Sequence, residues 1–360
     1  MKTFYKYIFV LFRCAGIFGF TCSKKDRGCI KTFKILLVVL NVAIALYQLS
    51  AMVSLLKQNK ANGNIPLTIV NLMVFANRCI LTVKMEELEN IINRLSKFKS
   101  NRLKSTTRLL SLTVAVLFFI QVFIVCYKLA SFGYIYPAKD ILFQLNIETP
   151  IIEKIIGYCF EISMFLFGVL PNTAFCVFYS SVCIHMRSII LSFEESLIKY
   201  KDFPNRFDHI FNSFSKIKDT VSYVDDELCF LVFICAIYSS CYMYLSISAF
   251  LHLQLFINTS ERLHYFIHFA NDLTLFIAMT CSASSVAEAS MRVRSISWKL
   301  PVSKGEPFFF QQKFLSFVEE GISLTVWKIV PISRNFIFGI LGAILTYTML
   351  FDTLTQKDSK

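Results

Sequence analysis

The sequence predicts an all-α membrane protein with seven transmembrane helices, a cytoplasmic amino terminus and an extracellular carboxyl terminus. Three observations support this fold class. Charged residues make up 17% of the 360 positions and hydrophobic residues 55%, whereas a soluble globular domain has about 25% charged residues. Seven long apolar stretches are separated by charged gaps. Lysine and arginine gather in every second gap, as they do on the cytoplasmic side of a membrane.

The amino-terminal segment, residues 1–33, begins with the letters MKTFYKYIFVLFRCAGIFGF. Arg13 interrupts the apolar run, and no small-residue cleavage site follows before the charged residues 24–27. A signal peptide normally has both an unbroken apolar core and such a cleavage site. We therefore expect an amphipathic helix at the cytoplasmic surface of the membrane, with a cleaved signal as the alternative.

The spans themselves are read from length, because a helix needs roughly 20 largely apolar residues to cross a bilayer. Seven stretches qualify: 34–56, 64–83, 109–135, 153–184, 229–258, 264–288 and 332–353. The first six form one unit over residues 34–288. The seventh, with a short extracellular tail, occupies residues 332–360.

Basic residues set the predicted orientation. The amino-terminal segment and the gaps after the second, fourth and sixth spans hold 8, 7, 6 and 5 lysines and arginines, 26 in all, against 6 on the other face. The basic face is expected to be cytoplasmic, which gives a multi-pass protein of the plasma membrane. The single N-x-S/T sequon, at Asn258, then lies in an outer loop as a candidate glycosylation site.

The cytoplasmic gaps 84–108 and 186–227 carry apolar residues at helical spacing. Alternating steps of three and four relate the members of two stripes: Met186, Ile190, Phe193, Leu197 and Tyr200 on one arm, and Phe207, Ile210, Phe214, Ile217, Val221, Val224 and Leu228 on the other. A shorter stripe runs through Leu88, Ile91, Leu95 and Phe98. We expect the fourth and fifth helices to continue beyond the membrane as a packed hairpin. The stripes either satisfy one another within a subunit or serve oligomerisation, and the sequence leaves both open.

Residues 289–331 are expected to form a cytoplasmic loop and a short anchor helix, with a break near Gly321 and Pro331 opening the last span. Within that span Gly339, Gly342 and Ala343 form a face of small residues, which lets helix backbones approach closely.

This carboxyl end resembles the insect gustatory receptor family, part of the arthropod seven-helix chemoreceptor superfamily. The family's hallmark is a last helix ending in Thr-Tyr, five mostly apolar residues and Gln-Phe, preceded by a Trp segment and an Arg at the helix start. The matching residues here are Trp327, Arg334, Thr346 and Tyr347. Thr353 and Leu354 stand at the Gln and Phe positions, so the resemblance does not extend to any role of that glutamine.

The resemblance implies a chemosensory, gustatory receptor that acts as a ligand-gated, non-selective cation channel. A small-molecule tastant would open it, and four subunits in a homo- or heterotetramer would surround a pore lined by the seventh helix. The predicted pore residues are Ala343, Thr346, Leu350 and Thr353, which share one helix face with Gly339. A ring of Leu350 side chains would be an apolar constriction that gates by dewetting. The alternative is that this face packs against the sixth helix.

A ligand pocket is expected in the outer half of the bundle, because polar residues inside spans are costly and usually functional. The predicted lining residues are Tyr127, Lys128, Tyr158, Glu161, Phe165, Tyr244, Ser248, His252, His268 and Asp272, with His264 on the same stripe as the last two. Aromatic walls with a few polar anchors are typical of small-molecule sites. Interhelical hydrogen bonding or hydration at the membrane edge is the alternative.

Other functions find less support. No cysteine pair has metal-ligand spacing, and His264, His268 and Asp272 lack a further ligand, so no metal or cofactor is expected. The basic residues flank spans and do not form a nucleic-acid patch, and no catalytic motif occurs. A G-protein-coupled receptor would need the opposite orientation. A transporter would be expected to show interrupted spans in matching halves.

Overall fold

The computed structural model describes residues 2–14, 61–98, 165–199, 207–251, 259–299 and 306–358, with isolated positions 17, 39, 116, 119, 123, 126, 151, 152, 155, 158 and 162. Within these ranges all regular elements are helices except for one small β-hairpin. In chain order they are α1 (Lys2–Cys14), α3 (Ala61–Val83), α4 (Met85–Leu95), the π-helix η1 (Phe165–Val169), α8 (Leu170–Lys199), α9 (Phe207–Leu251), α10 (Thr259–Ser297), α11 (Glu306–Glu319), β1 (Thr325–Val326), β2 (Val330–Pro331) and α12 (Arg334–Asp358).

Five of the described helices coincide with predicted spans. Within the described residues, α8, α9 and α10 are each long and apolar enough to cross a membrane, while the apolar parts of α3 and α12 are shorter, at Leu72–Val83 and Arg334–Leu350. The first and third predicted spans lie mostly outside the described residues, and their described positions 39, 116, 119, 123 and 126 are helical.

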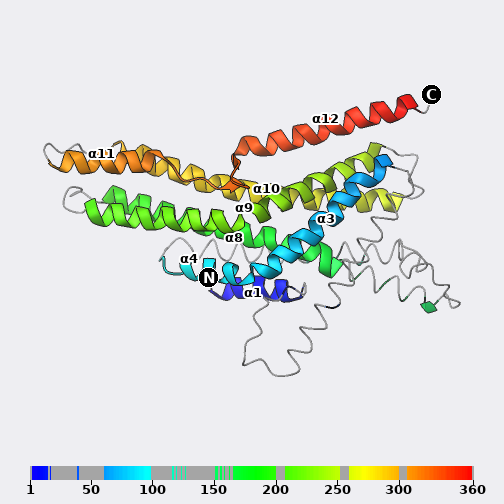
Figure 1. Cartoon of the computed structure of the whole chain (residues 1–360), viewed down its shortest axis with the longest axis horizontal. Coiled ribbons are helices and arrows are strands. Elements are labelled where there is room, and N and C mark those ends of the chain that lie inside the picture. Colours follow the sequence, from blue (N-terminus) through cyan, green and yellow to red (C-terminus); the bar gives the residue numbers. More distant parts are fainter. Residues whose placement is uncertain are drawn as a thin grey trace, which may run out of the picture.

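The longest helices extend well beyond one bilayer. Helix α9 has 45 residues, which makes it ~68 Å long at 1.5 Å per residue, against a hydrocarbon core of ~30 Å. Helices α8, α9 and α10 run side by side, α3 crosses them and packs on α9, and α12 lies at the edge of the bundle (Figure 1). Helices longer than a bilayer are therefore present, as predicted, and their continuation into the cytoplasm stays a prediction.

The two long apolar stripes pack against each other within one chain. Their described members are buried: Met186, Ile190, Phe193 and Leu197 on α8, and Ile210, Phe214, Ile217, Val221, Val224 and Leu228 on α9. The Phe193 and Phe214 ring centroids lie 5.3 Å apart, and Phe214 also contacts Phe314 of α11. Packing within the subunit is therefore what buries these stripes.

Helix α1 is amphipathic, as predicted, but its apolar face is covered by protein. Phe4, Tyr5, Ile8, Phe9 and Phe12 are buried. The rings of Tyr5, Phe9 and Phe12 all contact Phe178 of α8, with centroids 6.2 to 6.4 Å apart. The apolar face of α1 is thus buried against α8. That the helix lies at the membrane surface stays a prediction.

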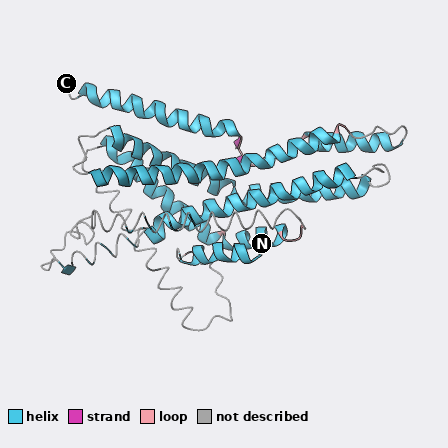
Figure 2. Ribbon diagram, turned by 180° about the vertical axis from the view of Figure 1, so that it is seen from behind, coloured by secondary structure: helices cyan, strands magenta, loops and turns pink. Residues whose placement is uncertain are grey.

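The segment between α11 and α12 corrects one prediction. Pro331 does not open the last span, because it belongs to β2, which pairs antiparallel with β1, and α12 begins at Arg334. The turn between the strands has φ of 49° at Trp327 and 57° at Lys328, as in a type I′ turn, and Ile329 N–H donates to the Val326 carbonyl at 3.0 Å. The hairpin connects the end of α11 to the start of α12 (Figure 2).

Candidate functional site

The polar stripe of α10 meets aromatic residues of α9. The His268 ring lies 5.6 Å from the Tyr242 ring, and Tyr242 lies 5.6 Å from Tyr238, one turn further along α9. Tyr238 is buried and interacts electrostatically with the carboxyl group of Asp272. Two of the predicted ligand residues, His268 and Asp272, therefore lie beside the same row of tyrosines.

Asp272 is the most unusual of these residues because it is only 3% exposed. Asp272 Oδ2 has no hydrogen-bond partner among the described residues. A buried polar atom without a partner is costly, of the order of 1–3 kcal/mol and more when charged. The lone pairs of this buried oxygen are suited to a donor or a cation supplied from outside the described helices.

Further buried polar atoms on the neighbouring helices have no hydrogen-bond partner within the described ranges. They include Ser239 Oγ on α9, next to Tyr238 in the sequence, and Asn172 Oδ1 on α8. Cys176, one turn after Asn172, lies near Tyr238, which places this part of α8 beside the tyrosine row. Helices α8, α9 and α10 thus each contribute an unsatisfied polar atom to the apolar interior.

The structure places the remaining predicted ligand residues unevenly. Tyr127, Lys128, Glu161, His252 and the sequon residue Asn258 lie outside the described residues, as does the side chain of His264. Tyr158, Tyr244 and Ser248 are half-buried, and Tyr244 packs against the core. Phe165 begins η1, the π-helical turn that precedes α8, and such turns occur frequently at functional sites. A pocket enclosed by all of these residues remains a prediction.

Sequence reasoning missed Tyr238 and Tyr242, although the signal was present. They are four residues apart on α9, matching the four-residue spacing of His268 and Asp272 on α10. The prediction selected the stripe through Tyr244 instead, because that stripe carries His252. Residues 242 and 244 are about 200° apart around a helix, so the two stripes point in different directions, and only packing decides which one meets α10.

The predicted pore residues lie on an exposed face of α12. The buried residues of α12 are Ile337, Ile344 and Thr348. On the side that faces α10, Phe336 contacts Phe276 with ring centroids 6.3 Å apart. By contrast Ala343 and Thr346 are exposed and Leu350 is 50% exposed, while the side chain of Thr353 lies outside the described residues. The alternative in which this face packs against the sixth helix is wrong for the described residues.

The small-residue face of α12 has no close neighbour in the described part of the chain. A Cβ atom built at Gly339 or Gly342 would meet nothing within 4 Å. The Thr346 hydroxyl donates to the Gly342 carbonyl at 2.8 Å, so its polar group is turned back to its own helix. This face therefore offers close backbone approach to another surface, which the described residues do not supply.

The residues that carry the family resemblance sit at the base of α12. Arg334 forms two contacts with the Glu288 carboxylate of α10, Nε to Oε1 at 2.7 Å and Nη2 to Oε2 at 3.0 Å. Trp327 stacks on α9, its ring 4.8 Å from that of Phe233. Tyr347 is 58% exposed on α12. Trp327 and Arg334 thus attach the start of α12 to α9 and α10.

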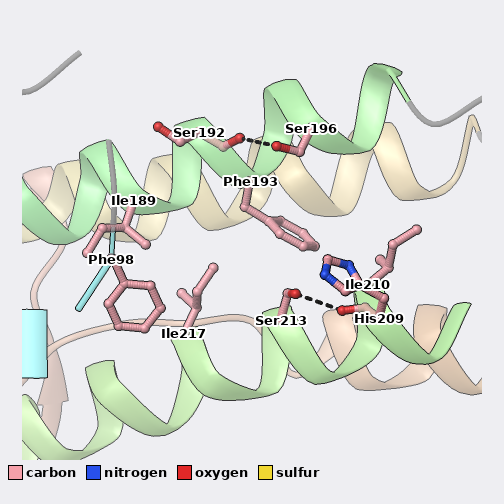
Figure 3. Close-up of a pocket in the computed structure, with 9 residues that line it drawn as sticks. All are labelled: Phe98, Ile189, Ser192, Phe193, Ser196, His209, Ile210, Ser213 and Ile217. Carbon is pink, nitrogen blue, oxygen red and sulfur yellow. Dashed lines mark hydrogen bonds between the residues drawn. The ribbon is translucent and has the colours of Figure 1, made fainter. Parts of the chain in front are cut away.

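A separate cavity of about 240 Å³ opens between α8 and α9 near the end of α4 (Figure 3). Its lining residues are Phe98, Ile189, Ser192, Phe193, Ser196, His209, Ile210, Ser213 and Ile217. The Ser196 and Ser213 hydroxyls donate to backbone carbonyls one turn earlier, which leaves mainly apolar walls. This cavity belongs to the hairpin extension and contains none of the predicted ligand residues.

Comparison with known proteins supports the fold. No protein-family model matches the chain, and no curated protein sequence matches it. The structure of the insect olfactory receptor OR5 from Machilis hrabei matches with a TM-score of 0.70 at 15% sequence identity, covering 97% of this chain and 97% of that chain. The same receptor in complex with eugenol matches with a TM-score of 0.72 at 15% identity, covering 98% of each chain. The all-α membrane fold class is confirmed, and so, at the level of fold, is the resemblance to the seven-helix chemoreceptors.

Proposed function

We propose that this multi-pass membrane protein is a chemosensory receptor of the gustatory type and acts as a ligand-gated, non-selective cation channel. A small-molecule tastant opens it, and four subunits surround a pore lined by α12 in the plasma membrane. The amino terminus is cytoplasmic and the extended helices form a cytoplasmic layer. The fold shared with an insect olfactory receptor whose structure holds the small molecule eugenol supports this proposal.

The observation that carries the proposal is the two-sided character of α12. One side packs on the bundle through Ile337, Ile344 and Thr348. The other presents Ala343, Thr346 and Leu350 outward. A helix that only anchors a protein in lipid needs no combination of small residues and threonine on its outward side. Small and hydroxyl residues followed by a ring of leucine suit a water-containing path with an apolar constriction.

The ligand site in this proposal is centred on Asp272 and His268. Asp272 Oδ2 is buried without a partner in the described residues, and the neighbouring Tyr238, Tyr242 and His268 supply aromatic walls. A ligand that donates a hydrogen bond would satisfy Asp272 and would be held against the tyrosine rings. Aromatic walls with one or two polar anchors are what small-molecule sites in proteins use.

The test is patch-clamp recording of the chain expressed alone and challenged with a panel of sugars, amines and bitter compounds. The proposal expects ligand-evoked unitary currents that reverse near 0 mV with sodium outside and potassium inside, as for a non-selective cation pore. A response carried only by coupled flux, without unitary currents, would establish a transporter instead. A response that requires a G protein would establish a coupled receptor.

A further inference from the structure

Three consecutive carboxylates, Asp225, Asp226 and Glu227, lie on α9 at the level where α3 ends and α12 begins. Successive residues of a helix point about 100° apart, so the three side chains face different neighbours. Each has a partner from another element, and none is used by the proposed ligand site or pore. The arrangement is local to one turn of one helix.

Asp225 holds the first strand of the hairpin. Its Oδ1 accepts the Thr325 backbone N–H at 2.7 Å, and its Oδ2 accepts the Thr325 hydroxyl at 2.7 Å. Both oxygens of one half-buried carboxylate are therefore engaged by one residue. Hydrogen bonds to an ionised acceptor are about twice as strong as neutral ones, and two from the same residue also fix its orientation.

Asp226 and the following turn hold the tip of the hairpin. Lys328 Nζ lies 2.5 Å from Asp226 Oδ1, and this hydrogen bond raises the pKa of Lys328. The Trp327 backbone N–H donates to the Cys229 carbonyl at 3.2 Å. Trp327 and Lys328 both have positive φ, which costs energy in residues other than glycine and persists where surrounding contacts hold it.

Glu227 points to the opposite side, toward the junction of α3 and α4. Lys84, the residue between those helices, donates from Nζ to Glu227 Oε2 at 2.7 Å and to the Glu227 carbonyl at 3.0 Å. The same turn of α9 therefore contacts the end of α3 on one side and the approach to α12 on the other.

From this juxtaposition we propose that Asp225 is the positioning residue of α12, and that the acidic triplet links the end of α3 to the start of α12. The hairpin reaches α12 after only two residues, Ile332 and Ser333. A displacement of Thr325 is therefore transmitted to Arg334 with little slack. That this positioning acts on gating rests on the proposed function of α12, whereas the attachment itself does not.

Hydrogen exchange measures the attachment without any ligand. Amides of residues 321–331 are followed by mass spectrometry in the full chain reconstituted in lipid nanodiscs, for the wild type and for Asp225→Ala, Asp225→Asn and Thr325→Val. Asp219→Ala, an exposed acid on the same helix, is the control. We expect Asp225→Ala to speed exchange about tenfold or more, and Thr325→Val less. Asp225→Asn should have the smallest effect, because its amide oxygen still accepts the Thr325 backbone N–H while its amide N–H donates to the Thr325 hydroxyl.

Two exchange results would overturn the positioning role. One is exchange at 321–331 that Asp225→Ala leaves as in the wild type. The other is equal acceleration along α8 and α9, because then the residue only stabilises the whole bundle. We expect the amides of α8 and α9 to be protected from exchange as in the wild type in every variant.

Single-channel recording separates this inference from the proposed function. Asp225→Ala is expected to change the basal open probability about tenfold, while the unitary conductance stays at the wild-type value. A changed conductance with unchanged open probability would contradict a positioning role. If the wild type carries no current at all, the channel proposal fails, and the exchange experiment still decides whether Asp225 positions the start of α12.

Discussion

Replacing Asp272 by Asn tests the proposed ligand site most directly. Asn has nearly the same shape as Asp, keeps one acceptor oxygen and replaces the other by an amide N–H donor. The residue is 3% exposed, so the change affects the interior alone. Because Asp272 Oδ2 already has no partner among the described residues, the replacement should leave the amount of protein at the cell surface nearly unchanged.

The size of the effect follows from the state of Asp272 Oδ2, which has no partner among the described residues. Asp272→Asn presents a donor where Oδ2 stood, so a ligand donor bound there would be left without its acceptor. Leaving a buried hydrogen-bonding group unsatisfied costs about 1–3 kcal/mol, and each 1.4 kcal/mol is a factor of ten in affinity. The half-maximal agonist concentration should therefore rise roughly fivefold to 150-fold.

The assay is a concentration–response curve for an agonist identified on the wild type, with relative cation permeability measured in the same cells. Thr274→Val is the matched control, because Thr274 lies on α10, is exposed and spends its hydroxyl on its own backbone. Its curve should coincide with that of the wild type. An unchanged half-maximal concentration together with altered permeability would refute the reasoning and move Asp272 from the ligand site to the ion path.

The remaining predictions concern the pore, the helical extension and the topology. Leu350→Ala should raise the ligand-independent current, because a smaller side chain widens an apolar constriction; an unaltered leak in whole-cell recording would argue against a pore-lining role. Phe214→Ala should cost about 3–5 kcal/mol of stability, since Phe214 is 1% exposed and contacts rings of both α8 and α11. Thermal aggregation in detergent reports it, and Phe309→Ala, at 66% exposure, should match the wild type; equal losses for both variants would contradict the packing argument. Asn258→Gln should abolish any glycan shift on a gel, and a glycan there requires that loop to lie outside; glycosylation of a sequon engineered into the amino-terminal segment would contradict the topology.

The packing of the α8–α9 hairpin could be predicted because its information is local. Phe214 and Phe193 belong to stripes that repeat every three or four residues, and a helix brings such positions to one face whatever surrounds it. A face of that kind must be buried. The sequence left open whether another subunit or the same chain buries it, because two complementary faces can pair either way. Only the folded chain shows that α8 covers α9.

The base of α12 shows the opposite case. Pro331 suggested a helix start, a rule that holds when the chain upstream is unconstrained. Here Thr325 is hydrogen-bonded to Asp225, 100 positions away in the sequence. Thr325 begins β1, and Pro331 pairs with it from β2 instead of starting a helix. A contact between residues so far apart leaves no periodic trace in either segment.

The candidate ligand site lies between these cases. Helical spacing, together with the free-energy cost of ionisable residues inside a span, predicted Asp272 and His268 as site residues. Such residues stand out in an apolar span by composition alone. The tyrosines that meet them, Tyr238 and Tyr242, do not stand out in an aromatic chain with 15 tyrosines. Which face of α9 turns toward α10 depends on the rotation of each helix about its axis, and side-chain packing sets that rotation.

By itself the sequence determined the fold class, the helical spans and the stripes that pack the extended hairpin, since each depends on the hydrophobicity and spacing of neighbouring residues. The tertiary structure decided how those helices are joined: α1 on α8, the acidic triplet of α9 between α3 and α12, and the outward face of Ala343, Thr346 and Leu350. These features depend on contacts between residues far apart in the chain, and their energies come from pairing and burial that exist only when the helices are assembled.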